Sequence, residues 1–437
     1  MQDIKHPELV RAIGRWTLTG LVLNSIIGSG IFGLPSVVAG SLGKASPWAY
    51  LVAAAGVGTI MACFAEVGSR FREAGGVYLY AREAFGRFAG IQMAWVSWLV
   101  RLTAAAANAN LFVIYLAQFW SPANERVSRL AILTLLIGVL AFVNYRGVRA
   151  GAQLSNVFVI SKLVPMLLFA LVGLFFLRPG TFVAPTFAAR GAWMDAVLVL
   201  VFAYGGFEAA LFPMGEAKNP QRDVPFALFV ALGVVTFLYT AIQVVVLGVL
   251  DSPEKIDRPL AAAAAQFLGP AGAALMTVGA LVSVYGYLNG MMLNTPRLTY
   301  ALAERHDFPH FLAAVHPRFR TPHVSIIAFG LMVWALAVAG NFRWNVTLSA
   351  VARLFTYAAT CAAVIALRKK QPGREVFRLP AGSVVALAGI AFSLVLVTRM
   401  DWSAVIIITV TAGIALVNWF WARKQKATEA QRSQSDS

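Results

Sequence analysis

Two glycine-rich segments lie inside long apolar stretches, and each is followed by a proline. They are NSIIGSGIFGLP (24–35) and FAYGGFEAALFP (202–213). Glycine and proline both weaken a helix interior, so each segment is expected to interrupt a helix. An interrupted helix presents free N–H groups at the start of one half and free C=O groups at the end of the other. Such a site can bind small anionic and cationic groups without a charged side chain.

The elements that must position these segments are membrane-spanning helices. The chain has 437 residues, of which 59% are hydrophobic and only 13% charged, whereas a soluble globular chain carries about 25% charged residues. Residues 16–43, 224–250 and 259–296 contain no Asp, Glu, Lys or Arg. Uncharged apolar stretches of this length are span candidates, and backbone groups in lipid must be paired internally, so the spans are helical.

Twelve spans are predicted, which makes the chain an all-α integral membrane protein. Of its 36 Lys and Arg residues, 24 fall in segments that are cytoplasmic if the N-terminus is inside, and nine fall in outer loops. This imbalance follows the positive-inside rule and places both termini in the cytoplasm. The predicted spans are approximately 17–42, 46–69, 88–118, 129–145, 153–177, 193–215, 225–250, 270–300, 323–341, 345–367, 380–398 and 402–422.

The two interrupted spans are the first and the sixth, so they lie five apart and cross the membrane in opposite directions. Paired interruptions at matching positions of two halves indicate a transporter binding site built from inverted repeats. We therefore expect two five-helix repeats followed by two added helices. The predicted segments are a cytoplasmic segment 1–15, a membrane domain 16–422 with repeats at about 16–177 and 193–368 and added helices at about 380–422, and a polar, disordered cytoplasmic tail 423–437.

Several other classes of function are disfavoured. The net charge of +17 is accounted for by topology and does not indicate nucleic acid. Cys63 and Cys361 lie inside predicted spans and imply no disulfide or metal site. The five His residues lie in the N-terminal segment, in an inner loop or at a span edge, so no catalytic or metal-ligating set is visible and no enzyme is expected. A channel usually repeats its pore-lining motif by symmetry, and this chain gives no sign of that.

The motifs also resemble a known family. GSGIFGLP (28–35), FAYGGFE (202–208), GEAKNPQRDVP (215–225) and PRFRTPHVSI (317–326), in this order within twelve spans, are similar to the amino acid–polyamine–organocation superfamily. The resemblance implies the leucine-transporter-type fold and alternating access. It also implies a substrate among amino acids, polyamines and related amines.

A zwitterionic substrate needs two opposite partners, and the interrupted helices supply both. We expect its carboxylate at the N–H groups of Ser29, Gly30 and Ile31, where the outer half of span 1 begins. We expect its ammonium near C=O groups of the two spans, and the family implies similar positions. Phe202 resembles the family's gating aromatic, although an ordinary core or lipid-facing Phe is the alternative. The predicted substrate-binding residues are Ile26, Gly28, Ser29, Gly30, Ile31, Phe202, Ala203 and Gly205.

Ionisable residues at depth are costly and are functional candidates. Lys162 lies about ten residues into span 5, roughly 15 Å deep at 1.5 Å per residue. It matches a span-5 lysine of the family, which stands where sodium-coupled relatives bind sodium. Lys162 is therefore either an ion-coupling group that exchanges a proton or a permanently charged strut. Glu208 is either a proton carrier, a partner for a cationic substrate, or a helix cap. Arg101 and Arg353 lie near mid-depth and are expected to pair with Glu208 or with backbone carbonyls.

These observations predict a transporter in the cell membrane that moves amino acids by alternating access. Proton coupling and a neutral amino acid are favoured; an amino acid or amine exchanger and a cationic amino acid or polyamine transporter are the alternatives. No cofactor or metal is expected, protons are the expected coupling ion, and no sodium is required. The expected partners are the substrate and the lipid bilayer, without nucleic acid, for a monomer or homodimer.

The topology can be tested by cysteine labelling in intact cells. A membrane-impermeant maleimide should label Glu254→Cys, in the outer loop 251–269, and should label Lys5→Cys only after the cells are opened. The parent protein, whose two cysteines lie within spans, is the background control. Labelling of position 5 from outside would reverse the orientation and remove the repeat assignment with it.

Overall fold

The computed structural model describes residues 13–71, 75–147, 153–179, 189–211, 218–372 and 377–435, with side chains left undescribed at 153–161 and 425–435. Within these ranges the chain is helical and contains no β-strand. The α-helices are α1 Arg15–Ile26, α2 Gly30–Leu42, α3 Ser46–Gly68, α4 Gly76–Phe85, α5 Arg87–Leu116, α6 Arg126–Arg146, α7 Gln153–Gly173, α8 Arg190–Tyr204, α9 Phe207–Ala210, α10 Pro220–Val249, α11 Pro259–Glu304, α12 His323–Ala339, α13 Phe342–Lys370, α14 Gly382–Val397 and α15 Trp402–Ser435.

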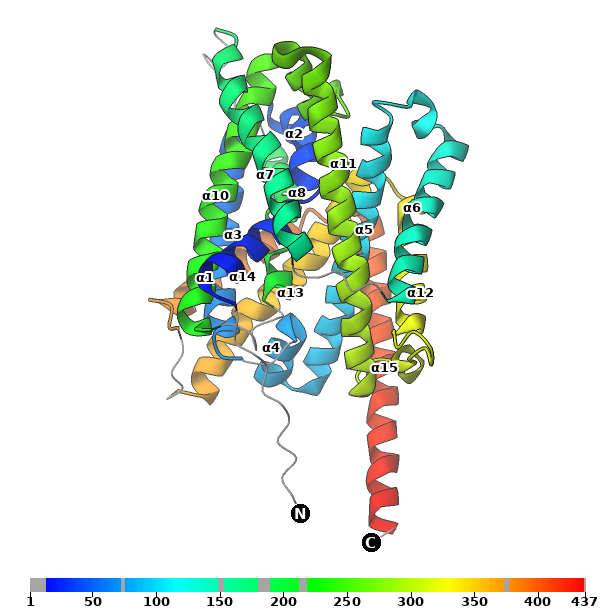
Figure 1. Ribbon diagram of the computed structural model, residues 1–437. Helices are drawn as coiled ribbons and strands as arrows, with labels where there is room; N and C mark the ends of the chain where they lie inside the picture. Colours follow the sequence, from blue (N-terminus) through cyan, green and yellow to red (C-terminus); the bar gives the residue numbers. More distant parts are fainter. Residues whose placement is uncertain are drawn as a thin grey trace.

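The helices pack side by side into one bundle (Figure 1), which supports the prediction of a multi-pass membrane protein. Among the described residues, eight helical stretches are long and apolar enough to cross a membrane. Three shorter apolar helices, Lys162–Phe176, His323–Ala339 and Gly382–Val397, coincide with further predicted spans. Aliphatic side chains such as Leu135, Leu171 and Val417 are exposed on the outside of the bundle, as expected of a surface that faces lipid.

Both predicted interruptions are present. Residues 27–29 separate α1 from α2, and residues 205–206 separate α8 from α9. Their sequences explain the breaks, because three glycines in six residues and a Gly-Gly pair make helix continuation costly. Pro213 and the first part of the 215–225 motif lie outside the described residues.

A third discontinuity lies in α11, the longest helix. Gly269 has a φ of 65° and is followed by Pro270, which kinks the helix between a short segment at Pro259–Leu268 and a long one that crosses the bundle. The outer loop predicted at 251–269 contains this first segment of α11. The Gly-Pro pair that ends it suits a sharp bend, since glycine adopts a positive φ without steric cost and proline cannot donate to the preceding turn.

The C-terminal segment differs from the prediction of a disordered tail. The backbone of α15 continues as a helix to Ser435 and projects beyond the bundle (Figure 1). The residues after 422 include Lys, Gln, Ala, Glu and Arg, which are good helix formers. A helix already nucleated by the apolar part of α15 can therefore propagate through them. We call the end of the bundle from which α15 projects the tail end. Residues 1–12 of the predicted N-terminal segment lie outside the described residues.

The tail end is held together by buried carboxylates. Glu66, near the end of α3, is fully buried. It accepts hydrogen bonds from Arg368 at 2.6 and 2.7 Å, from Arg70 at 3.2 Å and from the N–H of Leu379 at 3.0 Å. These contacts join α3, α13 and the chain that leads into α14, so one carboxylate fixes three segments.

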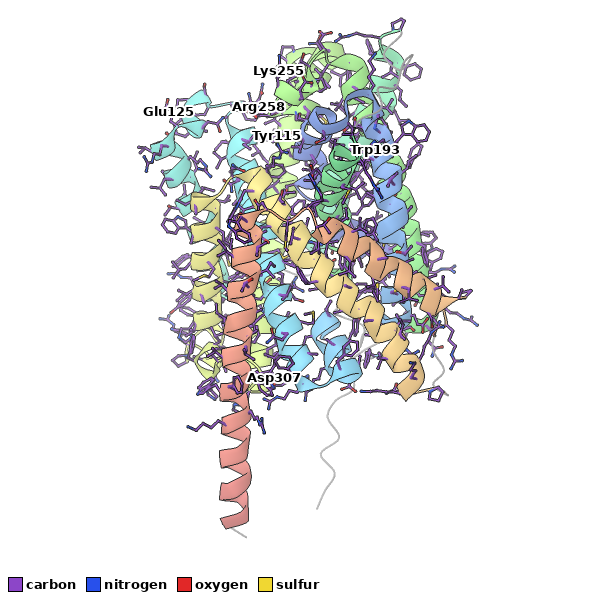
Figure 2. The ribbon with its side chains drawn as sticks, turned by 180° about the vertical axis from the view of Figure 1, so that it is seen from behind. Tyr115, Glu125, Trp193, Lys255, Arg258 and Asp307 are labelled. Atoms are coloured by element: carbon purple, nitrogen blue, oxygen red, sulfur yellow. The ribbon has the colours of Figure 1, made fainter. Side chains whose placement is uncertain are left out.

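Asp307 plays a similar part beside α15, as Figure 2 shows. Its carboxylate accepts hydrogen bonds from Arg87 at 2.6 Å, from Arg82 at 3.3 Å and from the hydroxyl of Tyr78. Burial and the hydrogen bond to Asp307 raise the pKa of Tyr78 to about 12. Tyr78 therefore remains a neutral donor at physiological pH, and the loop after α11 is anchored to α4 and α5.

Replacing Glu66 should destabilise the protein strongly. In Glu66→Ala the guanidinium of Arg70, whose side chain is 1% exposed, loses its carboxylate. Breaking a buried ion pair in this way costs about 3–5 kcal/mol. The unfolding midpoint of the detergent-purified variant should fall well below that of the parent. Asp195→Ala is the matched control, because the pair Asp195–Arg399 is solvent-accessible, with side chains 43% and 38% exposed. Equal midpoints for the two variants would contradict the assignment.

Candidate functional site

The two interrupted helices meet at their breaks. A β-carbon on Gly30 would lie 2.9 Å from the Cα of Ala203, so α2 begins directly against the backbone of α8. Gly206 has a φ of 111°, and a β-carbon there would overlap the carbonyl oxygen of Ser25 near the end of α1. Both positions therefore require glycine, because a side chain at either one would overlap the backbone of the other interrupted helix.

At the start of α2, one of the three predicted N–H groups already has a partner. The N–H of Ser29 donates to Asn108 Oδ1 on α5 at 3.2 Å, while the Ser29 hydroxyl is buried with no partner among the described residues. Gly30 and Ile31 belong to the first helical turn, whose N–H groups lack intrahelical acceptors. The start of α2 is thus a buried set of donors to which Asn108 supplies one acceptor.

The carbonyl groups near the breaks are also partly occupied. The C=O of Phe202 accepts the N–H of Gly205 at 3.2 Å, which closes the last turn of α8. The C=O of Ile27 accepts Lys162. Ile26 and Ala203 are both buried beside these groups. The structure therefore brings the predicted residues of spans 1 and 6 together around one buried region.

Lys162 reaches the first break from α7. It is 2% exposed, and its Nζ donates to Asn24 Oδ1 at 2.9 Å and to the C=O of Ile27 at 3.2 Å. The Lys162 ammonium therefore contacts a carbonyl at the break of span 1. Both acceptors are neutral, so the ammonium is held by dipoles rather than by a carboxylate.

Glu208 has one of the roles expected of it, that of a helix cap. Its Oε2 accepts the N–H of Gly206 at 2.8 Å and so caps the start of α9. Its Oε1 accepts Arg353 Nη1 at 2.5 Å, and the hydroxyl of Tyr357 lies 3.4 Å from Oε2. The carboxylate therefore ties the second break to α13 and has a cationic partner.

The two mid-depth arginines lie close to this carboxylate. Arg353 is 2% exposed, and its Cζ lies 6.0 Å from the centre of the Phe202 ring. Arg101 on α5 is buried within electrostatic range of Glu208 and Arg353. Phe202 is itself buried, which excludes the lipid-facing alternative for this side chain.

Sequence reasoning missed several residues that complete the site. Asn24 and Asn108 supply side-chain acceptors to Lys162 and Ser29, and Tyr287 on α11 lies against Gly28. A signal was present in span 3, where AAAANAN places an amide in a run of small residues. Buried amides in spans commonly bond across helices. The sequence around Tyr287 gave no such signal, because no residue pattern in α11 shows which side of the helix faces the site.

Away from the tail end, the site is covered by packed side chains. The ring of Phe342 on α13 contacts Gly33, and the hydroxyl of Tyr115 donates to the C=O of Phe32 at 2.8 Å. Ser36 Oγ donates to the C=O of Ile256 at 2.6 Å. Figure 2 shows Tyr115 at the end of the bundle opposite Asp307. These contacts pack α2 against α5, α13 and the loop before α11 at that end of the bundle.

A multi-pass helical protein with two apposed interrupted helices has the architecture of a secondary transporter. The family model described as amino acid permease matches residues 13–428. The chain belongs to this family, within the amino acid–polyamine–organocation superfamily, as the motifs predicted.

Named relatives are similar over most of their length. The methylthioribose transporter of Bacillus subtilis is 29% identical, over 96% of this chain and 95% of the relative. The serine/threonine exchanger of Bacillus subtilis is 28% identical, over 96% and 98%. The large neutral amino acids transporter small subunit 2 of Mus musculus is 28% identical, over 83% and 71%. These proteins are transporters, which confirms that the chain is not an enzyme.

Adding one methyl group at the first break should abolish transport. In Gly30→Ala the new β-carbon meets the Cα of Ala203 at 2.9 Å, so α2 and α8 must separate. Uptake of amino acids into proteoliposomes should fall at least tenfold. Gly20→Ala in α1, where nothing lies within 4 Å, is the matched control and should transport normally. Normal uptake by Gly30→Ala would remove the first break from the site.

Proposed function

We propose that this protein is a secondary active transporter of neutral amino acids in the cell membrane, working by proton-coupled alternating access. The observation that carries the proposal is the apposition of the two breaks, with Gly30 against Ala203 and Gly206 against Ser25. There the start of α2 offers N–H groups for a substrate carboxylate at Ser29, Gly30 and Ile31. Carbonyls of Ile26, Phe202, Ala203 and Gly205, beside Gly28, are suited to its ammonium.

The proposed architecture has twelve spans, arranged as a leucine-transporter-type five-plus-five inverted repeat with two added helices, in a monomer or homodimer. The breaks in the first and sixth predicted spans support it, and the distribution of Lys and Arg supports cytoplasmic termini. In this orientation the tail end is cytoplasmic. Phe202, buried beside Arg353, is the proposed gating aromatic.

A neutral substrate is favoured by the state of Glu208. A cationic side chain would need a carboxylate, and this one is already held by Arg353 and by the N–H of Gly206. The named substrates of relatives point the same way, since they are serine and threonine, branched-chain amino acids, large neutral amino acids and methylthioribose. Exchange of amino acids is the second candidate mode, because the serine/threonine relative is an exchanger.

Lys162 is the proposed ion-coupling residue. Its ammonium bonds Asn24 and the C=O of Ile27, both beside the break of span 1. Loss of its proton would leave Nζ with one lone pair and two hydrogens, weaken its hold on these acceptors and free the end of α1. A protonated lysine supplies a positive charge itself, so no sodium or cofactor is required.

A ligand screen should identify the substrate class. We expect small and branched neutral amino acids to raise the unfolding midpoint of the purified protein, since a ligand that binds the native state stabilises it. The set should include all twenty amino acids, spermidine, putrescine and methylthioribose. Gly30→Ala should lose the shifts, while Gly20→Ala should keep them. A shift with polyamines or lysine alone would contradict the neutral assignment.

Three variants should distinguish proton exchange from a structural strut at Lys162. Lys162→Ala should lose most uptake and its dependence on pH between about 5 and 8. Lys162→Arg keeps a cation that does not deprotonate, so it should fold normally but transport slowly at every pH. Lys255→Ala is the control, because Lys255 is exposed at the end of the 3₁₀ helix Pro253–Lys255.

Uptake into proteoliposomes should be measured with and without a proton gradient and sodium. A parent-like pH profile in Lys162→Arg would make this residue a strut. Uptake that requires sodium would remove the proton-coupling proposal. Accumulation that responds only to amino acid on the other side would assign exchange.

A further inference from the structure

A hollow of about 390 Å³ lies between the start of α6, the end of α12 and the start of α13. Figure 1 shows α6 and α12 side by side on one flank of the bundle, and Figure 2 shows Glu125, which precedes α6, at the end opposite Asp307. Ligand pockets commonly have volumes of about 300–1,000 Å³, so this hollow can admit a small molecule or a headgroup. Its described lining residues are Arg129, Val338, Ala339, Gly340, Asn341 and Trp344.

Arg129 is the charged residue among those that line the hollow, and one edge of its guanidinium is fixed by the protein. Its Nη2 donates to the C=O groups of Ala337 at 2.8 Å and Gly340 at 2.7 Å, and to Asn110 Oδ1 at 2.6 Å. These three acceptors use the two hydrogens of Nη2. Within the described part of the chain, Nε and Nη1 donate to no group. An oriented guanidinium with free N–H groups suits a carboxylate or a phosphate.

Asn341 adds a second donor to the same hollow. Its Oδ1 accepts the N–H of Trp344 at 2.9 Å and caps the start of α13. The other half of this amide, Nδ2, carries donors only, and it has no acceptor among the described residues. The indole of Trp344 donates to Ser403 Oγ at 2.9 Å, and its ring lies against Gly340, where a β-carbon would overlap it. The hollow thus combines free donors with an aromatic wall.

The surroundings of the hollow match the boundary between lipid headgroups and acyl chains. Phe119 and Trp120, in the chain before α6, are exposed aromatic residues, and such residues are enriched where spans meet the headgroups. Within the neighbouring helices, Leu130 on α6 and Leu331 on α12 are exposed on the outside of the bundle, as expected of side chains that contact acyl chains. A molecule with a polar head in the hollow and an apolar tail along these helices would fit both surfaces.

We propose that this hollow binds the phosphate of an anionic lipid headgroup, with Arg129 and Asn341 as its donors and Trp344 as its apolar wall. A headgroup without an ammonium, such as phosphatidylglycerol, is favoured, because the described lining residues include no carboxylate to pair with an ammonium. Glu125, one turn before Arg129, is not among them. The bound phosphate would join α6 to α13 at one membrane surface. This site is separate from the two breaks and does not depend on the identity of the substrate.

Native mass spectrometry of the purified full-length protein tests the proposal independently of transport. A single phosphatidylglycerol molecule should be retained in preference to phosphatidylcholine with the same acyl chains, since an anionic headgroup pairs with a basic pocket. Inorganic phosphate and acetate, added at equal ionic strength, distinguish a soluble oxyanion from the lipid, and neither should displace it. Equal retention of the two lipids, or displacement of phosphatidylglycerol by either soluble anion, would overturn the proposal.

A substitution at Asn341 locates the binding. Asn341→Asp keeps the helix cap, because aspartate is a good N-cap residue, but it replaces the donor Nδ2 with a charged oxygen. The affinity for phosphatidylglycerol should fall about tenfold or more, because a hydrogen bond to the phosphate becomes a repulsion. Asn124→Asp is the matched control. It makes the same charge change at an exposed residue of the 3₁₀ helix Ser121–Asn124, outside the lining of the hollow.

Arg129→Gln is the second variant and should weaken lipid binding at least as strongly, because it removes the positive charge. It also removes the crosslinks from Nη2 to the end of α12. If this variant does not fold, Asn341→Asp decides alone, since its cap is preserved. Parent-like affinity for phosphatidylglycerol in folded Asn341→Asp, or an equal loss in Asn124→Asp, would overturn the assignment of the site.

Discussion

Backbone polar groups inside a membrane must be paired, and at the breaks 27–29 and 205–206 this protein departs from helical pairing. Side chains around the breaks provide hydrogen bonds to the backbone groups there. Asn108 accepts the N–H of Ser29, Lys162 donates to the C=O of Ile27, and Glu208 accepts the N–H of Gly206. Asn108 belongs to α5, Lys162 to α7 and Glu208 to α9, directly after the second break. The packing of the surrounding helices is therefore tied to the state of the two irregular segments.

Buried ionisable side chains are also paired, but with different partners at the tail end and at the two breaks. At the tail end, Glu66 and Asp307 each hold at least two arginines and a further donor, which makes that region a rigid set of crosslinks. At the breaks, Lys162 donates to two neutral oxygens, and Glu208 lies in a cluster with two arginines. The lysine beside the proposed substrate site thus bonds neutral groups, whereas each tail-end carboxylate bonds two arginines.

Much of the fold could be predicted because its determinants are local. Charge-free stretches mark spans, and glycine pairs mark breaks, so α1, α2, α8 and α9 follow from sequence alone. The burial of Glu66 could not be predicted, since its partner Arg368 lies 302 residues away. The helical continuation of α15 was missed because a polar composition suggested disorder while the propensity of the same residues favoured helix.

The positions of the two breaks could be predicted from the sequence, but most of the side chains around them could not. Gly30 and Gly206 are conspicuous in sequence, but which helix packs against them depends on tertiary structure. Arg353 and Glu208 were recognised as costly at depth, and their mutual pairing was one of several open possibilities. Asn24, Asn108 and Tyr287 are ordinary residues in long helices, and only the three-dimensional arrangement makes them part of the site.

The bond between Asn108 and the N–H of Ser29 has a consequence for how tightly this site can hold a ligand. Under the proposed function, a carboxylate that arrives at the start of α2 finds one donor already in use. It must displace the amide oxygen, so it exchanges one hydrogen bond for another and gains only the difference. Asn108 thus acts as a built-in competitor that keeps the empty site ordered and lowers net affinity. A transporter must release its substrate in every cycle, so a modest affinity shortens the residence time of the substrate and favours turnover.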